Sequence, residues 1–460
     1  MKVTFLDVLD RAHTGPVVDK KNWELKIFPG KIREKLEKYG LKGVCDPENP
    51  VNTDDGLAND FWKAGFELAV ETGMYCSDTK RVINFTEDEL KTVLAEAPSE
   101  LQLGAGANRV TMKARKPEDK TRPRAIMAPL GLEISEELYI PLMQSIAQYR
   151  VIDIIAGGVP ATILGRRPRA RTPYETLLGA YEAALIKEAL RRANRVGMPV
   201  QGPEASPTEY GQLGGLGMPE GFNPTLTVAI PLLVNPLVTS YQLLHKTAHA
   251  LTCGAMIKPG YHSMIGGYAG SPEGAALEAI AAFILHMATH MGTYGDVATL
   301  DLRYLGNCGR EALWAQSISR QAQTLNTHAI ITGVVTQTAG PCTDMLLYET
   351  AAFEICDAAS GCASGFGTRP TGCRFPDYAS GLENRFCAEV VKASAGLRRG
   401  EACELVKALL PRYEDRLRRP PKGLSFPQCT DLKTLQPTPE WQAIYQKVWK
   451  ELENLGLQKP

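Results

Sequence analysis

Length, composition and charge place the chain among globular proteins and exclude several functions. It has 460 residues, of which 44% are hydrophobic and 22% charged, so a large core is possible. Lysine plus arginine equals aspartate plus glutamate at 51 each, and this balance gives no overall attraction to nucleic acid or to an anionic membrane.

The first hundred residues are predicted to form mainly helices. Asp7 interrupts the N-terminus too early for a secretory signal, and no run of the chain approaches the roughly 20 apolar residues of a membrane span. We therefore expect a cytoplasmic protein that binds neither membrane nor nucleic acid. Further on, Thr86-Glu87-Asp88-Glu89 has the pattern of a capping box. It predicts a helix from Glu87 to about Ala97, where Pro98 stops it.

From Leu101 the pattern changes to short apolar runs that end in glycine or proline, which is typical of strands. The runs are Leu101–Ala105, Ala125–Ala128, Val151–Ala156, Met198–Gln201, Leu226–Ile230, Ala255–Lys258, Met264–Gly267, Val297–Leu302 and Ile330–Val335. Helices are predicted between several of them. Thr172-Pro173 and Ser271-Pro272 each place an N-cap residue before a proline in the first helical position.

Alternation of strands and helices predicts a parallel sheet. We favour an α/β fold, a TIM (β/α)8 barrel with N- and C-terminal helical extensions, because glycines follow many of the predicted strands. Nine strands are one too many for this barrel, so one of them is a hairpin or an error. An open doubly wound sheet is the alternative, although no GxGxxG follows an early strand. The predicted segments are a helical extension over 1–100, the barrel over 101–380 and a helical segment over 381–460.

Metal binding is not predicted. The eleven cysteines contain no CxxC pair and are expected to be reduced. His245 with His249, and His286 with His290, have the four-residue spacing of zinc ligands on a helix. Neither pair encloses a glutamate or has a third ligand nearby, so we expect packing or capping histidines. The basic segment 165–171 is predicted to be a solvated loop or, on the catalytic face, a contact for an acidic partner protein or a substrate phosphate.

Three glycine-containing segments follow predicted strands and would let a ligand approach the backbone closely. They are Met198–Glu204, Gly266–Gly270 and Thr338–Asp344. In this order and spacing they resemble the monomethylamine methyltransferases of methanogens. The likeness extends to Ala64–Glu67 and Tyr75–Thr79 near the start and to Asp431–Thr434 near the end, so it covers essentially the whole chain.

The resemblance implies a barrel, a homo-oligomer of six chains, and methyl transfer to the cobalt of a separate corrinoid protein. It also implies a pocket centred on pyrrolysine, whose imine takes up the amine. The matching position here is Gln201, and an amide carbon is a poor electrophile. The family's acids that contact the amine fall at Ile230 and Gly260, and its glutamine and tyrosine fall at Val334 and Thr336. The glutamate after the pyrrolysine turn persists as Glu204.

These replacements predict a roomier and drier pocket than methylammonium needs, because that small ion has little apolar surface to bury. A quaternary ammonium fits better and has no lone pair to add to an imine. We expect Gln201 to shape or hydrogen-bond the donor and Glu204 to support the loop or balance charge. Tyr261 or Tyr268 is predicted to hold the cation, and Arg303 a carboxylate, although each has an alternative packing role.

The resulting hypothesis is a pyrrolysine-independent methyltransferase that moves a methyl group from a methylated amine to cobalt(I). The chain lacks the Asp-x-His-x-x-Gly corrinoid signature, so we expect no bound cofactor and a cognate corrinoid protein as partner. One alternative is monomethylamine as donor, with Gln201 printed for a decoded amber codon. Another is a non-catalytic barrel that binds a corrinoid protein or a small ligand.

Overall fold

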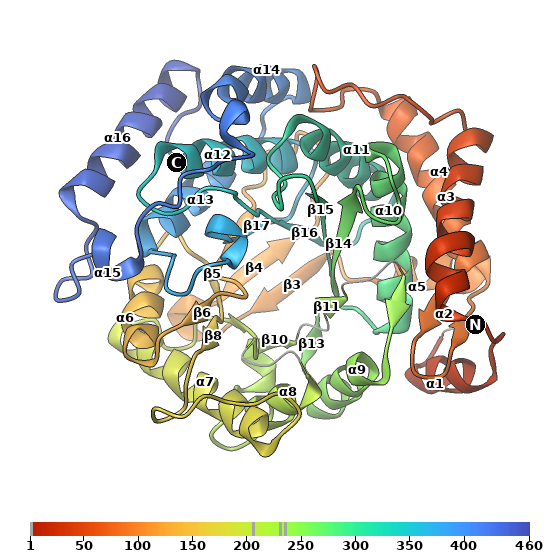
Figure 1. Ribbon diagram of the computed structural model, residues 1–460, viewed down its shortest axis with the longest axis horizontal. Helices are drawn as coiled ribbons and strands as arrows, with labels where there is room; N and C mark the ends of the chain where they lie inside the picture. Colours follow the sequence, from red (N-terminus) through yellow and green to blue (C-terminus); the bar gives the residue numbers. More distant parts are fainter. Residues whose placement is uncertain (1–2, 205–207, 230–231, 234–236) are drawn as a thin grey trace.

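The computed structural model describes residues 3–204, 208–229, 232–233 and 237–460. Its central feature is a parallel sheet of ten strand segments, surrounded by helices (Figure 1). The segments, in chain order, are β5 (Arg124–Pro129), β7 (Ile154–Ala156), β9 (Val200–Gln201), β10 (Thr227–Ala229), β11 (Leu232–Leu233), β13 (Met256–Ile257), β14 (Gly260–Ile265), β15 (Gly295–Asp301), β16 (Ile331–Val334) and β17 (Ser364–Thr368).

The ten segments form eight strand positions. Val228 of β10 pairs with Met256 of β13, and Leu232 of β11 pairs with Gly260 of β14 in the same register offset. β10–β11 and β13–β14 are therefore two interrupted strands that run side by side. Because β17 also pairs with β5, the sheet closes on itself. The predicted (β/α)8 barrel is confirmed.

A helix follows each strand position and packs around the barrel (Figure 1). These helices are α6 (Glu136–Ala147), α7 (Pro173–Arg192), α8 (Glu209–Gly215), α9 (Tyr241–Cys253), α10 (Pro272–Thr289), α11 (Arg310–Asn326), α12 (Asp344–Ala359) and α13 (Gly381–Ala393). Since α13 packs on β5 and β17, the helical layer of the barrel continues past residue 380, where the sequence placed the start of the C-terminal segment.

Local capping signals predicted helix starts correctly. The Thr86 side chain accepts a hydrogen bond from the Glu89 N–H at 3.3 Å, and α5 (Glu87–Glu96) follows it as a capping box. Thr172 caps α7 by accepting from the Tyr174 N–H, and Ser271 caps α10. Each contact satisfies a backbone donor that the first turn leaves free.

Two strand predictions need correction. Leu101–Ala105 contributes to β3 (Glu100–Leu103), which pairs antiparallel with β4 (Val110–Lys113) and lies outside the barrel sheet. This hairpin covers the N-terminal mouth, where its Leu103 joins the apolar cluster inside the barrel. The run Met264–Gly267 is only the end of β14, which begins at Gly260.

The strand β17 was missed because its glycines weaken the strand pattern. Gly367 has a positive φ of 60°, and Gly365 packs closely against α12. A Cβ at Gly365 would lie 2.5 Å from Glu354 Oε2, and one at Gly333 of β16 would lie 2.6 Å from Asp357 Oδ2. Both glycines therefore let buried acids of α12 approach the sheet.

Further elements cover the barrel at both ends of the chain, the N-terminal helices at the right of Figure 1 and the C-terminal helices at the upper left. The N-terminal elements are α1 (Phe5–Thr14), α2 (Lys20–Asn22), α3 (Phe28–Lys38), α4 (Asp55–Thr72), β1 (Met74–Cys76) and β2 (Arg81–Ile83), with β12 (Val238–Thr239) pairing on β1. The C-terminal helices are α14 (Arg399–Leu409), α15 (Phe426–Cys429) and α16 (Pro439–Asn454). Short strands β6 (Glu133–Ile134) and β8 (Val159–Pro160) extend β5 and β7.

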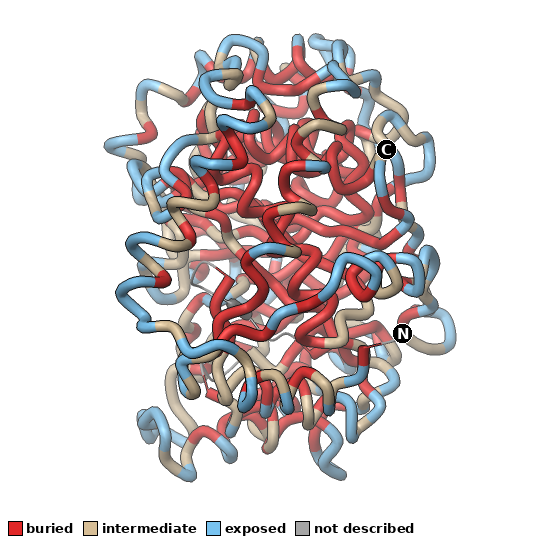
Figure 2. The backbone as a smooth tube through the Cα atoms, turned by 90° about the vertical axis from the view of Figure 1, so that its right-hand side faces the viewer, coloured by how far each residue is buried: buried red, intermediate tan, exposed pale blue. Residues whose placement is uncertain are grey.

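The core runs through the barrel and its helices, and exposed residues are confined to outer turns and helix faces (Figure 2). α4 packs on α10 and α11, while α14 and α16 pack on α12. Within the described ranges, no helix is both long enough and apolar enough to cross a bilayer.

Candidate functional site

Gln201 is the last residue of β9 and is fully buried. The Tyr294 hydroxyl donates a hydrogen bond to its Oε1 at 3.2 Å. Tyr294 directly precedes β15, which is not a neighbour of β9, so this bond crosses the barrel interior. Gln201 Nε2 has no hydrogen-bond partner among the described residues. The glutamine is thus oriented by its oxygen and presents a free amide donor inside the barrel.

Two further contacts cross the interior. Lys258 Nζ lies 3.6 Å from the centroid of the Phe366 ring and donates to Asp296 Oδ2 at 2.8 Å. Arg369, which follows β17, donates from Nη1 to His262 Nε2 at 3.4 Å. With Gln201 and Tyr294 these polar residues form a group that we call the barrel polar cluster. Its members are Gln201, Lys258, His262, Tyr294, Asp296 and Arg369.

Several buried polar atoms around this cluster lack a partner in the described part of the chain. They are Gln201 Nε2, Asp296 Oδ1, Thr336 Oγ1, Thr368 Oγ1 and Arg369 Nε. Folded proteins pair the great majority of buried polar groups, because an unpaired one costs about 1–3 kcal/mol. Their presence on strands and strand ends of one barrel makes the barrel interior a candidate site for a polar ligand.

Glu204 lies just beyond the end of β9. Its backbone N–H donates to both carboxylate oxygens of Glu182 on α7, each at 3.0 Å, and this fixes the start of the loop. Its own Oε1 is buried and unpaired among the described residues. Burial raises the pKa of Glu204 to about 7, although the nearby cations Lys258 and Lys246 lower it. Glu204 therefore changes charge close to neutral pH.

The cationic side of the interior consists of Lys258 and Arg369. Burial lowers the pKa of Lys258, while the Asp296 carboxylate opposes this shift. Burial, with Arg369 beside it, lowers the pKa of His262 to about 4. His262 is thus neutral at pH 7 and can accept the hydrogen bond from Arg369.

Of the other residues that the sequence singled out, three lie on or just after the strands that line the barrel interior with Gln201. Val334 belongs to the apolar cluster inside the barrel, and Thr336, two residues on, carries one of the unpaired hydroxyls. Gly260 pairs in register with Asp296, so it lies on the same inner face of the sheet. Ile230 lies outside the described residues.

The other three predicted site residues lie away from the interior. Tyr261 points outward, where its hydroxyl donates to Glu278 of α10 at 2.5 Å. Tyr268 is 39% exposed, in the turn after β14. Arg303 is bound by two carboxylates, those of Asp301 and Glu311. The aromatic rings inside the barrel are instead Phe366 and Tyr294, and the cation at the strand ends is Arg369.

The histidine pairs and the basic segment have structural positions. His290 lies between the hydroxyls of Thr239 and Thr247, and its ring packs near His286 at a centroid distance of 6.3 Å. Among the residues that the structure describes, no three metal-ligating side chains come together. The segment 165–171 is mostly exposed, in the loop between β8 and α7.

Most of the barrel polar cluster was not predicted from the sequence. Lys258 ended a predicted strand, but nothing marked it as inward-facing. His262, Tyr294, Asp296 and Arg369 occur singly, and each acquires its partner only through contacts across the barrel. A period of two along β14 and β15 was the available signal.

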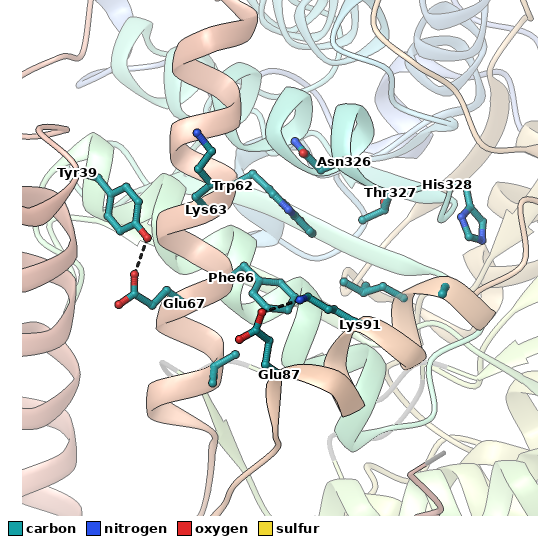
Figure 3. A pocket seen from close by; sticks show the side chains of 13 residues that line it. Tyr39, Trp62, Lys63, Phe66, Glu67, Glu87, Lys91, Asn326, Thr327 and His328 are labelled. Carbon is teal, nitrogen blue, oxygen red and sulfur yellow. Dashed lines mark hydrogen bonds and ion pairs between the residues drawn. The ribbon is translucent and has the colours of Figure 1, made fainter. Parts of the chain in front are cut away.

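A separate hollow lies on the outer surface, between α4, α5 and the end of α11 (Figure 3). Its volume is about 620 Å³, and its lining includes Trp62 and Phe66. The charged groups around it are paired: Glu67 accepts from Tyr39, and Lys91 pairs with Glu87. None of the barrel polar cluster lines this hollow.

A closed parallel barrel with buried polar groups at its strand ends is typical of barrel enzymes. Comparison with known proteins shows the family to which this barrel belongs. The family model described as monomethylamine methyltransferase MtmB matches residues 3–457. The chain belongs to this family.

The chain matches relatives and solved structures along nearly its full length. The monomethylamine methyltransferase MtmB of Methanosarcina mazei is 32% identical, with 98% of this chain and 97% of the relative covered. MtmB2 of Methanosarcina barkeri has the same identity and coverage. The crystal structure of the Methanosarcina barkeri enzyme superposes with a TM-score of 0.95 at 30% identity, covering 100% of this chain and 99% of the other. The structure of a hydroxylamine MtmB complex gives the same values.

Proposed function

We propose that this protein transfers a methyl group from a quaternary ammonium compound to the cobalt(I) of a corrinoid held by a partner protein, without pyrrolysine. The proposal depends mainly on the identity and surroundings of Gln201. It is buried at the end of β9, held by Tyr294, and its free amide faces the barrel interior. By the family resemblance this is the pyrrolysine position, and an amide forms no amine adduct.

The reaction is a direct displacement. The bond between the methyl carbon and nitrogen breaks, and its electron pair stays on nitrogen, which leaves as a neutral tertiary amine. The new carbon bond forms with the electron pair of cobalt(I), which arrives as a substrate on the partner protein. The barrel contributes orientation and exclusion of water rather than proton transfer to the donor.

The lining supports a quaternary donor. Val334 and Gly260 offer no charge to the small methylammonium ion, which has almost no apolar surface to bury. The buried Tyr294 ring provides an aromatic face inside the barrel, and Glu204 provides a carboxylate at the strand end. We infer that Gln201 shapes the site or donates from Nε2 to a hydrogen-bond acceptor elsewhere in the donor molecule, and that Glu204 balances the charge of the quaternary nitrogen.

A donor panel tests the proposal. Purified protein and reduced free cob(I)alamin are mixed with mono-, di- and trimethylamine, several quaternary amines, and methyl thiols and ethers. Formation of methylcobalamin is followed by absorbance. We expect turnover of a quaternary amine and none of monomethylamine. Turnover of monomethylamine alone would overturn the proposed donor class.

Membership of the family favours a second candidate, in which monomethylamine is the donor and residue 201 is decoded as pyrrolysine in the native host. The same panel, run with protein purified from the native host, separates the two, because only this candidate predicts turnover of monomethylamine. Binding of a corrinoid protein without any methyl transfer would instead indicate a non-catalytic barrel. The hexamer implied by the resemblance is tested by sedimentation.

Glu204 gives a pH-dependent prediction. Because its pKa is raised to about 7, the carboxyl is neutral below this pH and charged above it. Binding of tetramethylammonium, measured by calorimetry, is expected to strengthen between pH 6 and pH 8, about one unit either side of that pKa. In Glu204→Gln this strengthening should disappear. An unchanged pH profile in the variant would remove Glu204 from the cation site.

A further inference from the structure

Arg369 is partly buried, and its side-chain partners differ from those of the buried Arg320 and Arg195. Arg320 binds the Asp357 carboxylate, and Arg195 donates to Asn108 and to several carbonyls. The Arg369 guanidinium donates to His262 and also interacts with the Cys373 thiol, while its buried Nε is unpaired within the described chain. No carboxylate in the described ranges pairs with it, although an arginine carries five donors suited to a carboxylate.

Arg303, the arginine that the sequence favoured for this role, is already neutralised. Asp301 binds it through two oxygens and Glu311 adds a second carboxylate. A ligand carboxylate would have to displace both. Arg369 therefore has the free capacity that Arg303 lacks.

The described interior of the barrel carries charges of both signs. Arg369 follows β17, and Lys258 lies against Phe366 of the same strand, where the Asp296 carboxylate pairs with it. His262 packs against Arg369 as a neutral acceptor, which orients the guanidinium without adding charge. Glu204 supplies the acid beyond β9, close enough to interact electrostatically with Arg369. This pattern complements a zwitterion.

Two neutral hydroxyl groups lie on the strand that leads to Arg369 or next to it. Thr368, which directly precedes Arg369, and Thr336 at the end of the neighbouring strand both have buried hydroxyls without partners in the described chain. A hydroxyl donates readily to a carboxylate oxygen. The unpaired groups on these two strands therefore all suit an anion.

We propose that Arg369 binds a carboxylate of the methyl donor, with Thr368 and Thr336 beside it, so that the donor is a small betaine, an N-methylated quaternary ammonium carboxylate. The proposal rests on the proposed function, because it names the substrate class of the same site. Arg369 acts as a specificity-determining residue. It holds the carboxylate end while the methyl groups stay near Gln201 and Glu204.

The test compares betaines with matched alcohols. The betaines of glycine, β-alanine and proline are titrated calorimetrically into wild type, Arg369→Gln and Arg369→Lys, and each is paired with the analogue in which an alcohol replaces the carboxylate. Arg374→Gln is the control, since this exposed arginine lies five residues further along and donates to a backbone carbonyl. Melting temperatures check that each variant is folded.

In wild type we expect at least one betaine to bind about tenfold or more tighter than its alcohol, the value of one charge-assisted contact. Arg369→Gln should remove this preference and leave alcohol binding unchanged. Arg369→Lys should restore part of it, and Arg374→Gln should behave as wild type. Equal binding of betaines and alcohols by wild type, or an unchanged preference in Arg369→Gln, would overturn the assignment.

Methyl transfer by the same proteins separates the two proposals. Turnover of carboxylate-free quaternary amines as fast as betaines would overturn the Arg369 assignment and leave the proposed function standing. Turnover of monomethylamine alone would overturn both. Selective turnover of one betaine would support both proposals if Arg369→Gln raises the KM for that betaine and changes kcat less.

Discussion

Gln201→Leu is expected to abolish methyl transfer while the protein stays folded. Leucine has a similar volume, so the barrel is not overfilled, but it neither accepts the Tyr294 hydrogen bond nor offers an amide to the donor. The Tyr294 hydroxyl then loses its acceptor and the donor loses its orientation. Even small displacements of reacting groups cost about a hundredfold in rate. Methylcobalamin formation measures the effect, and circular dichroism checks the fold.

The matched control is Gln323→Leu on α11. Gln323 is also a buried glutamine, but its amide donates to the Ala279 carbonyl outside the barrel. This variant should lose some stability and keep its activity. Full activity in Gln201→Leu would exclude Gln201 from the site.

Asp357→Ala is expected to lower the free energy of unfolding by about 3–5 kcal/mol, because it leaves a buried guanidinium without its counter-charge. Arg320 Nε donates to Asp357 Oδ1 at 2.9 Å, and the two side chains are 0% and 1% exposed. Gln316 also donates to this carboxylate at 2.8 Å. The three residues join α11 and α12 next to Gly333, so their loss loosens the outer wall of the barrel.

Denaturant unfolding measures this loss. The double variant Arg320→Met, Asp357→Ala should recover part of it, since the unpaired charge is then gone. Asp344→Ala is the control, because Asp344 pairs with Arg416 in a half-exposed ion pair worth about 1 kcal/mol or less. A loss in Asp357→Ala no larger than in Asp344→Ala would show that the buried pair contributes little.

Local patterns in the sequence predicted those features of the fold that depend on residues close together in the chain. Capping by Thr86 and Thr172 fixed the starts of two helices, and alternating strands and helices identified the barrel. β17 was missed because Gly365 serves close packing and Gly367 a positive φ, and neither residue favours a strand. The hairpin β3–β4 resembled a barrel strand because the pattern of a short apolar strand does not reveal its pairing.

Some residues of the candidate site could likewise be expected from the sequence, and others could not. Gln201 and Glu204 were expected in the site because the family resemblance places pyrrolysine at residue 201, on a segment in which a strand end is followed by a turn. Tyr261 was placed in the site although it follows Gly260 directly, and successive side chains of a strand point to opposite faces. The partner of Arg303, two residues earlier at Asp301, was visible in the sequence. Arg369 was not recognisable, because its lack of a counter-charge appears only when the barrel closes.

We propose that methyl transfer here proceeds without pyrrolysine. The mass of the peptide that contains residue 201 is the direct test. Protein is purified from its native host and shown to transfer a methyl group to cob(I)alamin, and the peptide is then measured by mass spectrometry. We expect the mass of glutamine at residue 201 in active protein. The larger mass of pyrrolysine at that position would contradict it and identify monomethylamine as the expected donor.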